Sequence, residues 1–205
     1  MADETDEDAF EARYNARRER MLSQPPRCLA PFAAELAKAR ELPGIRFDGH
    51  GAPTQSIFRL RCTCGGESFR VRGTFYAKDY KGDPLNFFGD PLELICQPCG
   101  REQLLFDAAK DGYNPEIDAA EDLVRPPSRR RNESEAPRVE YGCSKCGGRA
   151  MHIWTRFEHV ADTCEDSFAE SLSEGREQDF FSWFTLVGRC AKCGTLQTVT
   201  EFECA

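Results

Sequence analysis

The sequence predicts a mainly β protein, α+β overall, built from two small domains that are related by internal duplication and preceded by a helical segment. Three observations predict this fold. Most of the 11 cysteines among the 205 residues fall into four closely spaced pairs. Short strand-like runs, broken by glycine and proline, follow these pairs. The first part of the chain has a helical pattern instead.

Residues 1–56 are expected to form a helical arm and a connector. The segment starts acidic and then becomes basic, which suits a helix because its N-terminal end favours carboxylates and its C-terminal end favours cations. A second helix is expected in PFAAELAKARELPG, residues 31–44, where Pro31 can open it and Pro43-Gly44 can close it. We expect both helices to serve packing or tethering.

The first two cysteine pairs have the spacing of a metal site. Cys62 and Cys64 are followed by Cys96 and Cys99. Zinc prefers four ligands in a tetrahedron, and two thiolates close together in sequence can bind one ion from a tight turn. The glycine after each pair supplies the backbone angles that such a turn needs. Residues 57–110 are therefore expected to form one domain closed by a metal ion.

The pattern recurs in residues 139–205, where the ligands would be Cys143, Cys146, Cys190 and Cys193. The copies share further positions when Cys64 is aligned with Cys146: Gly65-Gly66 with Gly147-Gly148, Phe69 with Met151, Val71 with Ile153, Phe75 with Phe157, and Leu92 with Leu186. A matched repeat argues against coincidence. The sequence therefore predicts two structural Zn²⁺ ions in two related copies.

Two segments lie outside this repeat. Residues 111–138 are expected to be a polar linker, because they end in a stretch rich in proline, serine and charge. The run Arg129-Arg130-Arg131 in the linker is expected to be solvated, with a nucleic-acid contact as the alternative. The second copy also contains the acidic insertion DTCEDSFAESLSEGREQDFFSWF, which is expected to be helical around residues 165–175.

These features resemble the zinc-ribbon class, in which cysteine-bearing turns end two β-hairpins and a third strand completes a small sheet. The resemblance covers residues 57–110 and 139–205 and implies a tandem zinc ribbon. The end of the first copy, CGREQLLFDAAKDGYN, is also similar to the ends of uncharacterised bacterial zinc-ribbon proteins. The class implies a fold and a metal, and it does not imply a particular function.

Three cysteines and the histidines are not needed for these sites. We expect Cys28 to be an inert thiol, Cys164 to lie in a small core and Cys204 to lie on a polar chain end. His152 and His159 would project to opposite faces of one strand, so they do not form a ready ligand pair. The sequence therefore predicts no third metal site.

The chain is expected not to be an enzyme. Two complete four-cysteine sets leave no open metal position, whereas a catalytic zinc keeps one. The carboxylates follow no pairing pattern, and the sequence has no nucleophile elbow and no phosphate-binding glycine loop. A metal-dependent enzyme or a redox protein remains as an alternative.

The charge distribution bears on partners and location. The net charge is −8 at pH 7, and it would be more negative with two four-thiolate zinc sites, which disfavours non-specific attraction to nucleic acid. The first copy has eight basic and seven acidic residues, and the second has six and eleven. No apolar run approaches membrane-spanning length, and the start of the chain is acidic where a secretory signal is basic. We therefore expect a cytoplasmic protein without membrane contact.

Two candidate binding surfaces lie in the first copy. In FRLRC and FRVRG, arginines alternate with apolar residues, so four guanidinium groups would share one face if the two strands pair as a hairpin. Aromatic residues also lie in a turn-rich loop, where they could anchor a partner or cap a thin core; DFFSWF in the second copy has the same ambiguity. The candidates are Arg59, Arg61, Arg70 and Arg72 for the first surface, and Tyr76, Tyr80, Phe87 and Phe88 for the second.

The sequence thus predicts a non-catalytic zinc-binding module that acts through macromolecular binding, with a protein as the expected partner. An adaptor, an inhibitor or a toxin-neutralising protein would fit. Nucleic-acid binding through the four-arginine face is the second hypothesis, and an ordinary solvent-facing surface is the simplest alternative for that face. The oligomeric state does not follow from the sequence.

Overall fold

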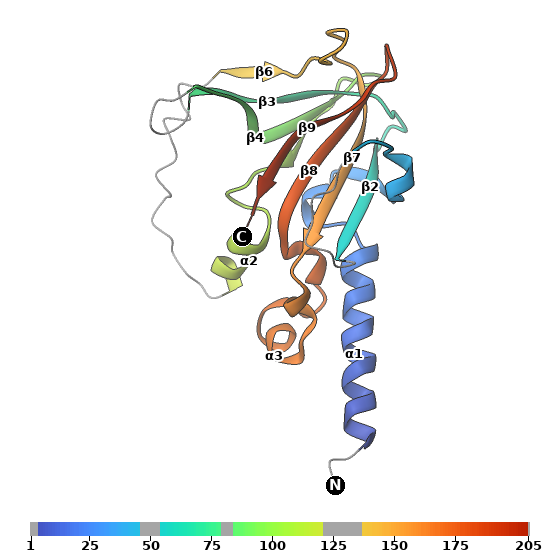
Figure 1. Ribbon diagram of the computed structural model, residues 1–205, viewed down its shortest axis with the longest axis vertical. Helices are drawn as coiled ribbons and strands as arrows, with labels where there is room; N and C mark the ends of the chain where they lie inside the picture. The colour runs from blue at the N-terminus through green and yellow to red at the C-terminus, as the bar shows by residue number, and fades with distance from the viewer. Residues whose placement is uncertain (1–3, 46–53, 79–83, 121–136, 205) are drawn as a thin grey trace.

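The computed structural model describes residues 4–45, 54–78, 84–120 and 137–204. In these ranges a long helix leads into a curled sheet of nine antiparallel strands, and short helices lie at one end of the sheet (Figure 1). The predicted mainly β fold with an N-terminal helix is confirmed. No helix within the described ranges is long and apolar enough to span a membrane.

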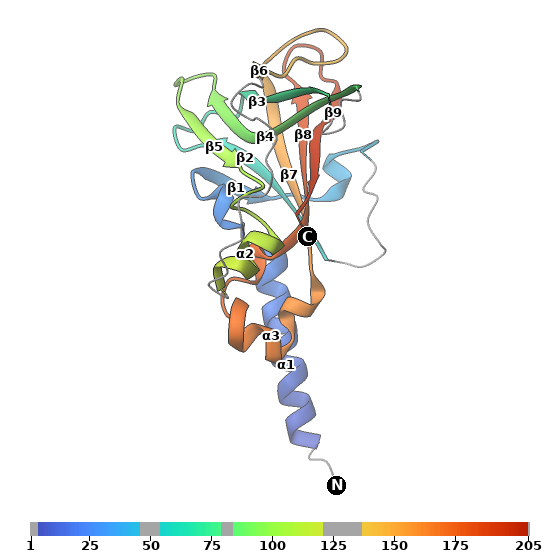
Figure 2. The same ribbon diagram turned by 90° about the vertical axis from the view of Figure 1, so that its left-hand side faces the viewer.

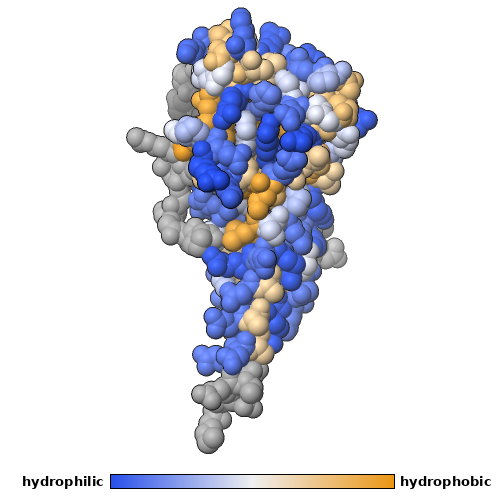
Figure 3. All heavy atoms as spheres, turned by 90° about the vertical axis from the view of Figure 1, so that its right-hand side faces the viewer, coloured by the Kyte–Doolittle hydropathy of each residue, from blue (hydrophilic) through white to orange (hydrophobic). Residues whose placement is uncertain are grey.

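The N-terminal segment begins as predicted and then departs from the prediction. Helix α1 (Glu4–Ser23) extends away from the sheet (Figure 2), and its surface is mostly hydrophilic (Figure 3). A short 3-10 turn, η1 (Arg27–Leu29), follows. The second helix expected at 31–44 is wrong, because strand β1 (Phe32–Leu36) and the 3-10 turn η2 (Ala39–Glu41) occupy this segment.

Tertiary contacts explain why this segment is a strand. β1 pairs in antiparallel fashion with β2 (Gln55–Cys62), so the backbone groups along one edge of β1 are satisfied by the sheet. Phe32 is buried, and its ring lies edge-on to that of Phe69 at 6.1 Å between centroids. The helix propensity of an alanine-rich run amounts to a few tenths of a kcal/mol per residue, about the size that tertiary context routinely overrides.

The internal duplication stays a prediction, and the first and second copy below mean the two cysteine-bearing segments, residues 57–110 and 139–205. The remaining strands fall in these segments. From β1 the sheet runs β1-β2-β7-β3-β4-β5, with β8 and β9 continuing from β7, and β6 beside β3. The first copy contains β3 (Phe69–Lys78), β4 (Pro84–Cys96) and β5 (Glu102–Phe106), and the second contains β6 (Arg138–Glu140), β7 (Met151–His159), β8 (Phe181–Cys190) and β9 (Leu196–Glu203).

The two copies exchange their leading strands. β2 precedes the first cysteine pair but pairs with β7 of the second copy, while β6 precedes the third pair but pairs with β3 of the first copy. Phe69 and Met151, which occupy equivalent positions in the sequence repeat, pair with each other. The hairpin of β2 with β3, which was the condition for a shared four-arginine face, therefore does not form. The boundaries 57–110 and 139–205 stay a prediction, but their strands form one sheet.

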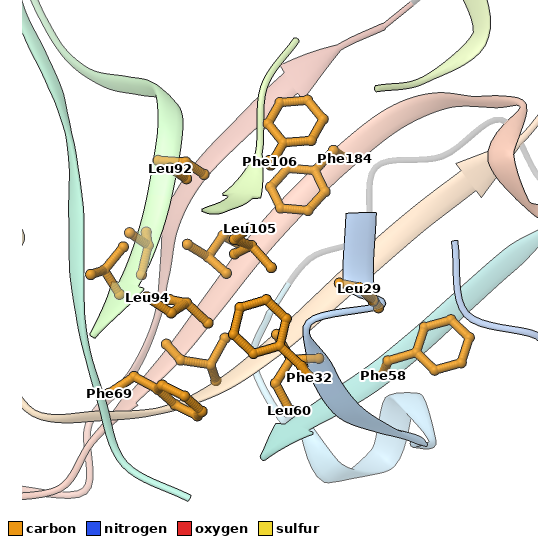
Figure 4. Packing of buried hydrophobic residues seen from close by; sticks show 14 of the residues in the cluster. Leu29, Phe32, Phe58, Leu60, Phe69, Leu92, Leu94, Leu105, Phe106 and Phe184 are labelled. Carbon is orange, nitrogen blue, oxygen red and sulfur yellow. The ribbon is translucent and has the colours of Figure 1, made fainter. Parts of the chain in front are cut away.

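One hydrophobic core serves both copies (Figure 4). Phe106 from the first copy stacks on Phe184 from the second, with ring centroids 4.2 Å apart and an interplanar angle of 1°. Leu29 and Phe32 from the N-terminal segment belong to the same cluster. Because this cluster continues without a break from one copy to the other, neither copy buries its apolar side chains alone.

The linker expected at residues 111–138 stays a prediction, and both of its described ends contain secondary structure. Helix α2 (Tyr113–Ala120) lies in its first part, and β6 overlaps its last residue. Glu116 of α2 is buried and forms ion pairs with Arg27 and Arg176, which explains why this polar segment is ordered against the body. The run 129–131 lies outside the described residues.

The acidic insertion of the second copy is helical, as predicted, although its turns are short. Gly175 ends the helical stretch with a φ of +76°, a conformation that glycine adopts without a steric penalty. The turns are η3 (Ala161–Cys164), α3 (Asp166–Phe168), the π-helical turn η4 (Ala169–Ser173) and η5 (Glu177–Asp179).

The exchanged strands predict that one copy does not fold alone. We expect residues 137–205 with added zinc to lack a dispersed amide NMR spectrum, because β7 loses its partner β2 and the shared core loses one side. Coexpression with residues 1–136 should restore the spectrum. A well-dispersed spectrum from the isolated segment would contradict the shared core.

Candidate metal sites

The eight predicted ligands form two groups of four thiols. In each group the sulfur atoms all lie within 4.8 Å of one another. In the first group the Sγ atoms of Cys62 and Cys99 are 3.7 Å apart, and those of Cys64 and Cys96 are 3.6 Å apart. The two corresponding distances in the second group are both 3.6 Å. A tetrahedron with Zn–S bonds of about 2.3 Å has edges of about 3.8 Å, so both groups could hold a metal ion with little movement.

The turns that carry the thiols repeat their backbone hydrogen bonds between the two groups. The amide of Cys62 donates to the carbonyl of Gly66, and the amide of Cys143 donates to the carbonyl of Gly148, both at 2.8 Å. The turns of the second cysteine pairs match in the same way. The amide of Cys96 donates to the carbonyl of Arg101, and the amide of Cys190 donates to that of Thr195, both at 2.9 Å. The next amides, of Gln97 and Ala191, donate to the carbonyls of Ser68 and Ala150, again at 2.9 Å. The same local backbone geometry therefore builds both sites.

The two glycines after the first cysteine pair of each copy have different tasks. Gly65 and Gly147 have φ values of +86° and +68°, in the left-handed region that favours glycine. A Cβ atom on Gly66 would lie 2.9 Å from the Sγ atom of Cys96, and one on Gly148 would lie 3.1 Å from the corresponding thiol of the second site. The sequence predicts the role of the first glycine in the turn. The close approach of the second glycine to the opposite thiol becomes visible only in three dimensions.

Gly66→Ala is expected to weaken metal binding at the first site about tenfold or more, because the added methyl group displaces a ligand sulfur. Competition with a chromophoric chelator would measure the affinity of each site. Gly142→Ala is the matched control, since a Cβ there meets its nearest atom at 3.7 Å, an ordinary contact. An unchanged affinity for Gly66→Ala would show that the turn tolerates the methyl group.

The local environment of Cys193 favours the thiolate, which is the form that binds metal. The Oγ1 atom of Thr195 lies 3.2 Å from its Sγ atom. This hydroxyl, together with the backbone amide of the same residue, lowers the pKa of Cys193 to about 6. Sequence reasoning does not identify Thr195, because the equivalent position in the first copy is Arg101.

Each group is joined to the core through one cysteine of each pair. Four of the eight ligands are buried members of the main hydrophobic cluster, while the other four lie nearer the surface. A bound ion would therefore connect a surface turn to the shared core. The four core members are Cys62, Cys96, Cys143 and Cys190.

The other cysteines take no part in a metal group among the described residues. Cys164 is buried, as predicted, and Cys28 is half-buried. Cys204 corrects the prediction of a polar chain end, because it is buried in the main core. Burial raises the pKa of Cys204 to about 12 and also raises the pKa of Cys28 and Cys164, so all three are protonated, unreactive thiols at neutral pH.

The described histidines lie apart from the thiols. His159 is buried, and its Nε2 atom lies 2.8 Å from the hydroxyl of Ser56. Burial lowers the pKa of His159 to about 3, so this ring is neutral. His152 is half-buried and hydrogen-bonds to the carbonyl of Glu67 at 3.1 Å. Both rings serve the structure of the sheet.

The four candidate arginines flank buried apolar residues, as predicted, but each of them is paired with a glutamate. Because β7 lies between β2 and β3, the arginines of these two strands do not form one hairpin face. A guanidinium group that is already paired has less charge to offer a phosphate, and a binding role stays a prediction. The closest pairs are Arg59 with Glu67 at 2.6 Å, Arg61 with Glu67 at 2.9 Å, Arg70 with Glu140 at 2.6 Å and Arg72 with Glu102 at 2.9 Å.

The described candidate aromatics pack at the margin of the core. Phe87 lies edge-on to Phe202 at 5.6 Å and stacks on Tyr76 at 6.2 Å, and Phe88 lies 5.3 Å from Tyr141. These contacts favour the capping interpretation over an exposed anchor. In the second copy, the predicted ambiguity resolves in the same direction for Phe180, Phe181 and Phe184, which are buried. Tyr80 lies outside the described residues.

Comparison of the chain with protein-family models, curated proteins and solved structures finds no match.

Proposed function

We propose that the chain binds two structural zinc ions, one in each four-thiol group. The observation that carries this proposal is the clustering of the sulfur atoms: two pairs in each group are 3.6 to 3.7 Å apart, close to the edge of a tetrahedral zinc site, and all four sulfurs of a group lie within 4.8 Å of one another. Four protein sulfurs complete the coordination of zinc, so no position is left for a substrate. This favours a structural role for both ions.

Substitution with Co²⁺ tests the coordination directly. A tetrahedral four-thiolate site should give intense visible bands and sulfur-to-cobalt charge transfer, with two Co²⁺ ions bound per chain. Cys99→Ser and Cys193→Ser should each weaken the signal of one site. Weak absorption typical of six-coordinate cobalt would contradict the proposal, and so would unchanged spectra in both variants.

We further propose that the zinc-loaded protein acts by binding another protein and has no catalytic activity. The chain is acidic, with a net charge of −8, and the four candidate arginines are paired with glutamates. Both features disfavour a nucleic-acid partner. Affinity capture with the zinc-loaded chain from its source cell would test the protein partner, and the double variant Cys99→Ser/Cys193→Ser serves as the unfolded control.

The protein-binding and nucleic-acid-binding functions predict opposite results in an anisotropy assay with labelled nucleic acid. We expect no change in the anisotropy of labelled single-stranded RNA or duplex DNA at low salt, because the chain is acidic and the arginines of β2 and β3 are paired with glutamates. Binding that falls steeply with salt and disappears in Arg59→Glu/Arg61→Glu would support the nucleic-acid function instead.

A further inference from the structure

Helix α1 is fixed to the body through its second half. Met21 is buried there, and its sulfur lies 3.7 Å from the thiol of Cys164. Hydrogen bonds from Arg13 and then Arg17 lower the pKa of Asp166 to about 2, so this carboxylate stays ionised at any physiological pH. The ion pairs that hold the helix on the acidic insertion are Arg13 with Asp166 at 2.7 Å, Arg17 with Asp166 and Glu174, and Arg20 with Glu177 at 2.7 Å.

The part of α1 before Arg13, here called its projecting half, stands clear of the body in both ribbon views (Figures 1 and 2). Residues 7–12 are all exposed. With a rise of 1.5 Å per residue, the part of α1 before Arg13 is about 13 Å long. Within the described part of the chain, Glu7, Asp8 and Glu11 form no ion pair with the body.

The face of α1 that packs on the body continues into the projecting half. Phe10, Tyr14 and Met21 lie on one side of the helix, because they are separated by four and seven residues. Met21 is buried and Tyr14 is half-buried, whereas Phe10 is 44% exposed. The side of α1 that packs on the body thus continues past the point where the helix leaves the body.

The carboxylates next to Phe10 indicate the chemistry of a partner. Glu7 lies one turn before Phe10 on the same side of the helix and Glu11 borders this side, whereas Asp8 lies on the opposite side. We propose that the projecting half of α1 docks its Phe10 side into an apolar groove bordered by lysine and arginine side chains on a partner protein. This proposal rests on the protein-binding function above. It specifies the contacting surface as a helix-in-groove contact with acidic borders.

Site-specific photocrosslinking tests this surface in the zinc-loaded full chain. Phe10→p-benzoylphenylalanine, expressed in the source cell, should crosslink to a protein at a basic surface. Asn15→p-benzoylphenylalanine is the matched control, because Asn15 is exposed on the opposite side of the same helix. Reversing the charges next to Phe10 with Glu7→Lys/Glu11→Lys should lower the crosslink yield about tenfold. Glu19→Lys, an exposed position on the anchored half, should leave the yield unchanged.

The outcomes separate this proposal from the protein-binding function. Three results would overturn the docking helix: equal crosslinking from positions 10 and 15, a crosslink yield that is unchanged by the charge reversal, or no crosslink from position 10. If affinity capture then still returns a partner whose binding is unchanged in Phe10→Ala, the protein-binding function stands and another surface carries it. If neither experiment yields a protein partner, both proposals fail. After a partner is identified, Phe10→Ala should weaken its binding about tenfold or more.

Discussion

Complete removal of the metal ions is expected to unfold the whole chain in one cooperative transition. Each proposed site connects a surface turn to the core through two buried cysteines, and that core is shared by both copies. Structural zinc sites contribute about 10–16 kcal/mol of apparent binding free energy, compared with about 5–15 kcal/mol for the stability of a whole domain. Loss of both ions therefore removes more free energy than the rest of the fold supplies.

Chelator titration followed by circular dichroism and amide NMR would measure this transition. Signals from both copies should disappear together, and added zinc should restore them. Cys99→Ser and Cys193→Ser should each destabilise the first and the second copy alike, because strands of one copy complete the sheet of the other. A chain that keeps dispersed NMR signals after verified metal loss would contradict a structural role for the ions.

Phe184→Ala is expected to lower the free energy of unfolding by about 3–5 kcal/mol, the usual range for removing a fully buried phenylalanine. The ring of Phe184 stacks on Phe106 and also contacts Phe157 and Phe202, and it has no exposed surface. Urea unfolding of the zinc-loaded protein would measure the change. Because Phe106 belongs to the first copy, both copies should unfold in the same destabilised transition.

A phenylalanine outside the core provides the control for this measurement. Phe10→Ala should change the stability by less than about 0.5 kcal/mol, because Phe10 lies on the projecting half of α1. If Phe184→Ala instead produced two transitions, with the first copy unfolding at its original denaturant concentration, the two copies would be separate folding units. That result would contradict the shared core.

The metal ligands were the most predictable part of the molecule, because closely spaced cysteines and their glycines form a local pattern. Two thiols within a tight turn are brought together by the turn itself, and the repeat shows which pairs belong together. The observed groups contain the eight predicted cysteines. Gly66 was not predictable as a neighbour of the Cys96 thiol, since this contact depends on how two distant turns meet. Thr195 was not predictable either, since the equivalent position of the first copy is Arg101.

The strand exchange could not be predicted, because it depends on contacts between residues far apart in sequence. Alternation predicts which side chains of β2 and β3 face the core, and Phe58 and Val71 are indeed buried. Alternation does not predict which strand lies next to which. β2 pairs with β7 on one edge and with β1 on the other, so an alanine-rich segment with helical character becomes a strand.

The acidic insertion illustrates a second limit of sequence reasoning. Its charges and the arginines of α1 are visible in the sequence, but they lie about 150 positions apart, as in the Arg17 to Asp166 pair with a separation of 149. Opposite charges occur throughout such a chain, so composition alone does not select the partners. Only the fold shows that the insertion receives the second half of α1.

The zinc content of the purified chain tests the central claim most directly. Elemental analysis of protein prepared without added metal or chelator should find two zinc ions per chain, and one each in Cys99→Ser and Cys193→Ser. Less than one metal ion per chain in folded protein would contradict the claim. Iron in place of zinc would also contradict it and would point to redox chemistry.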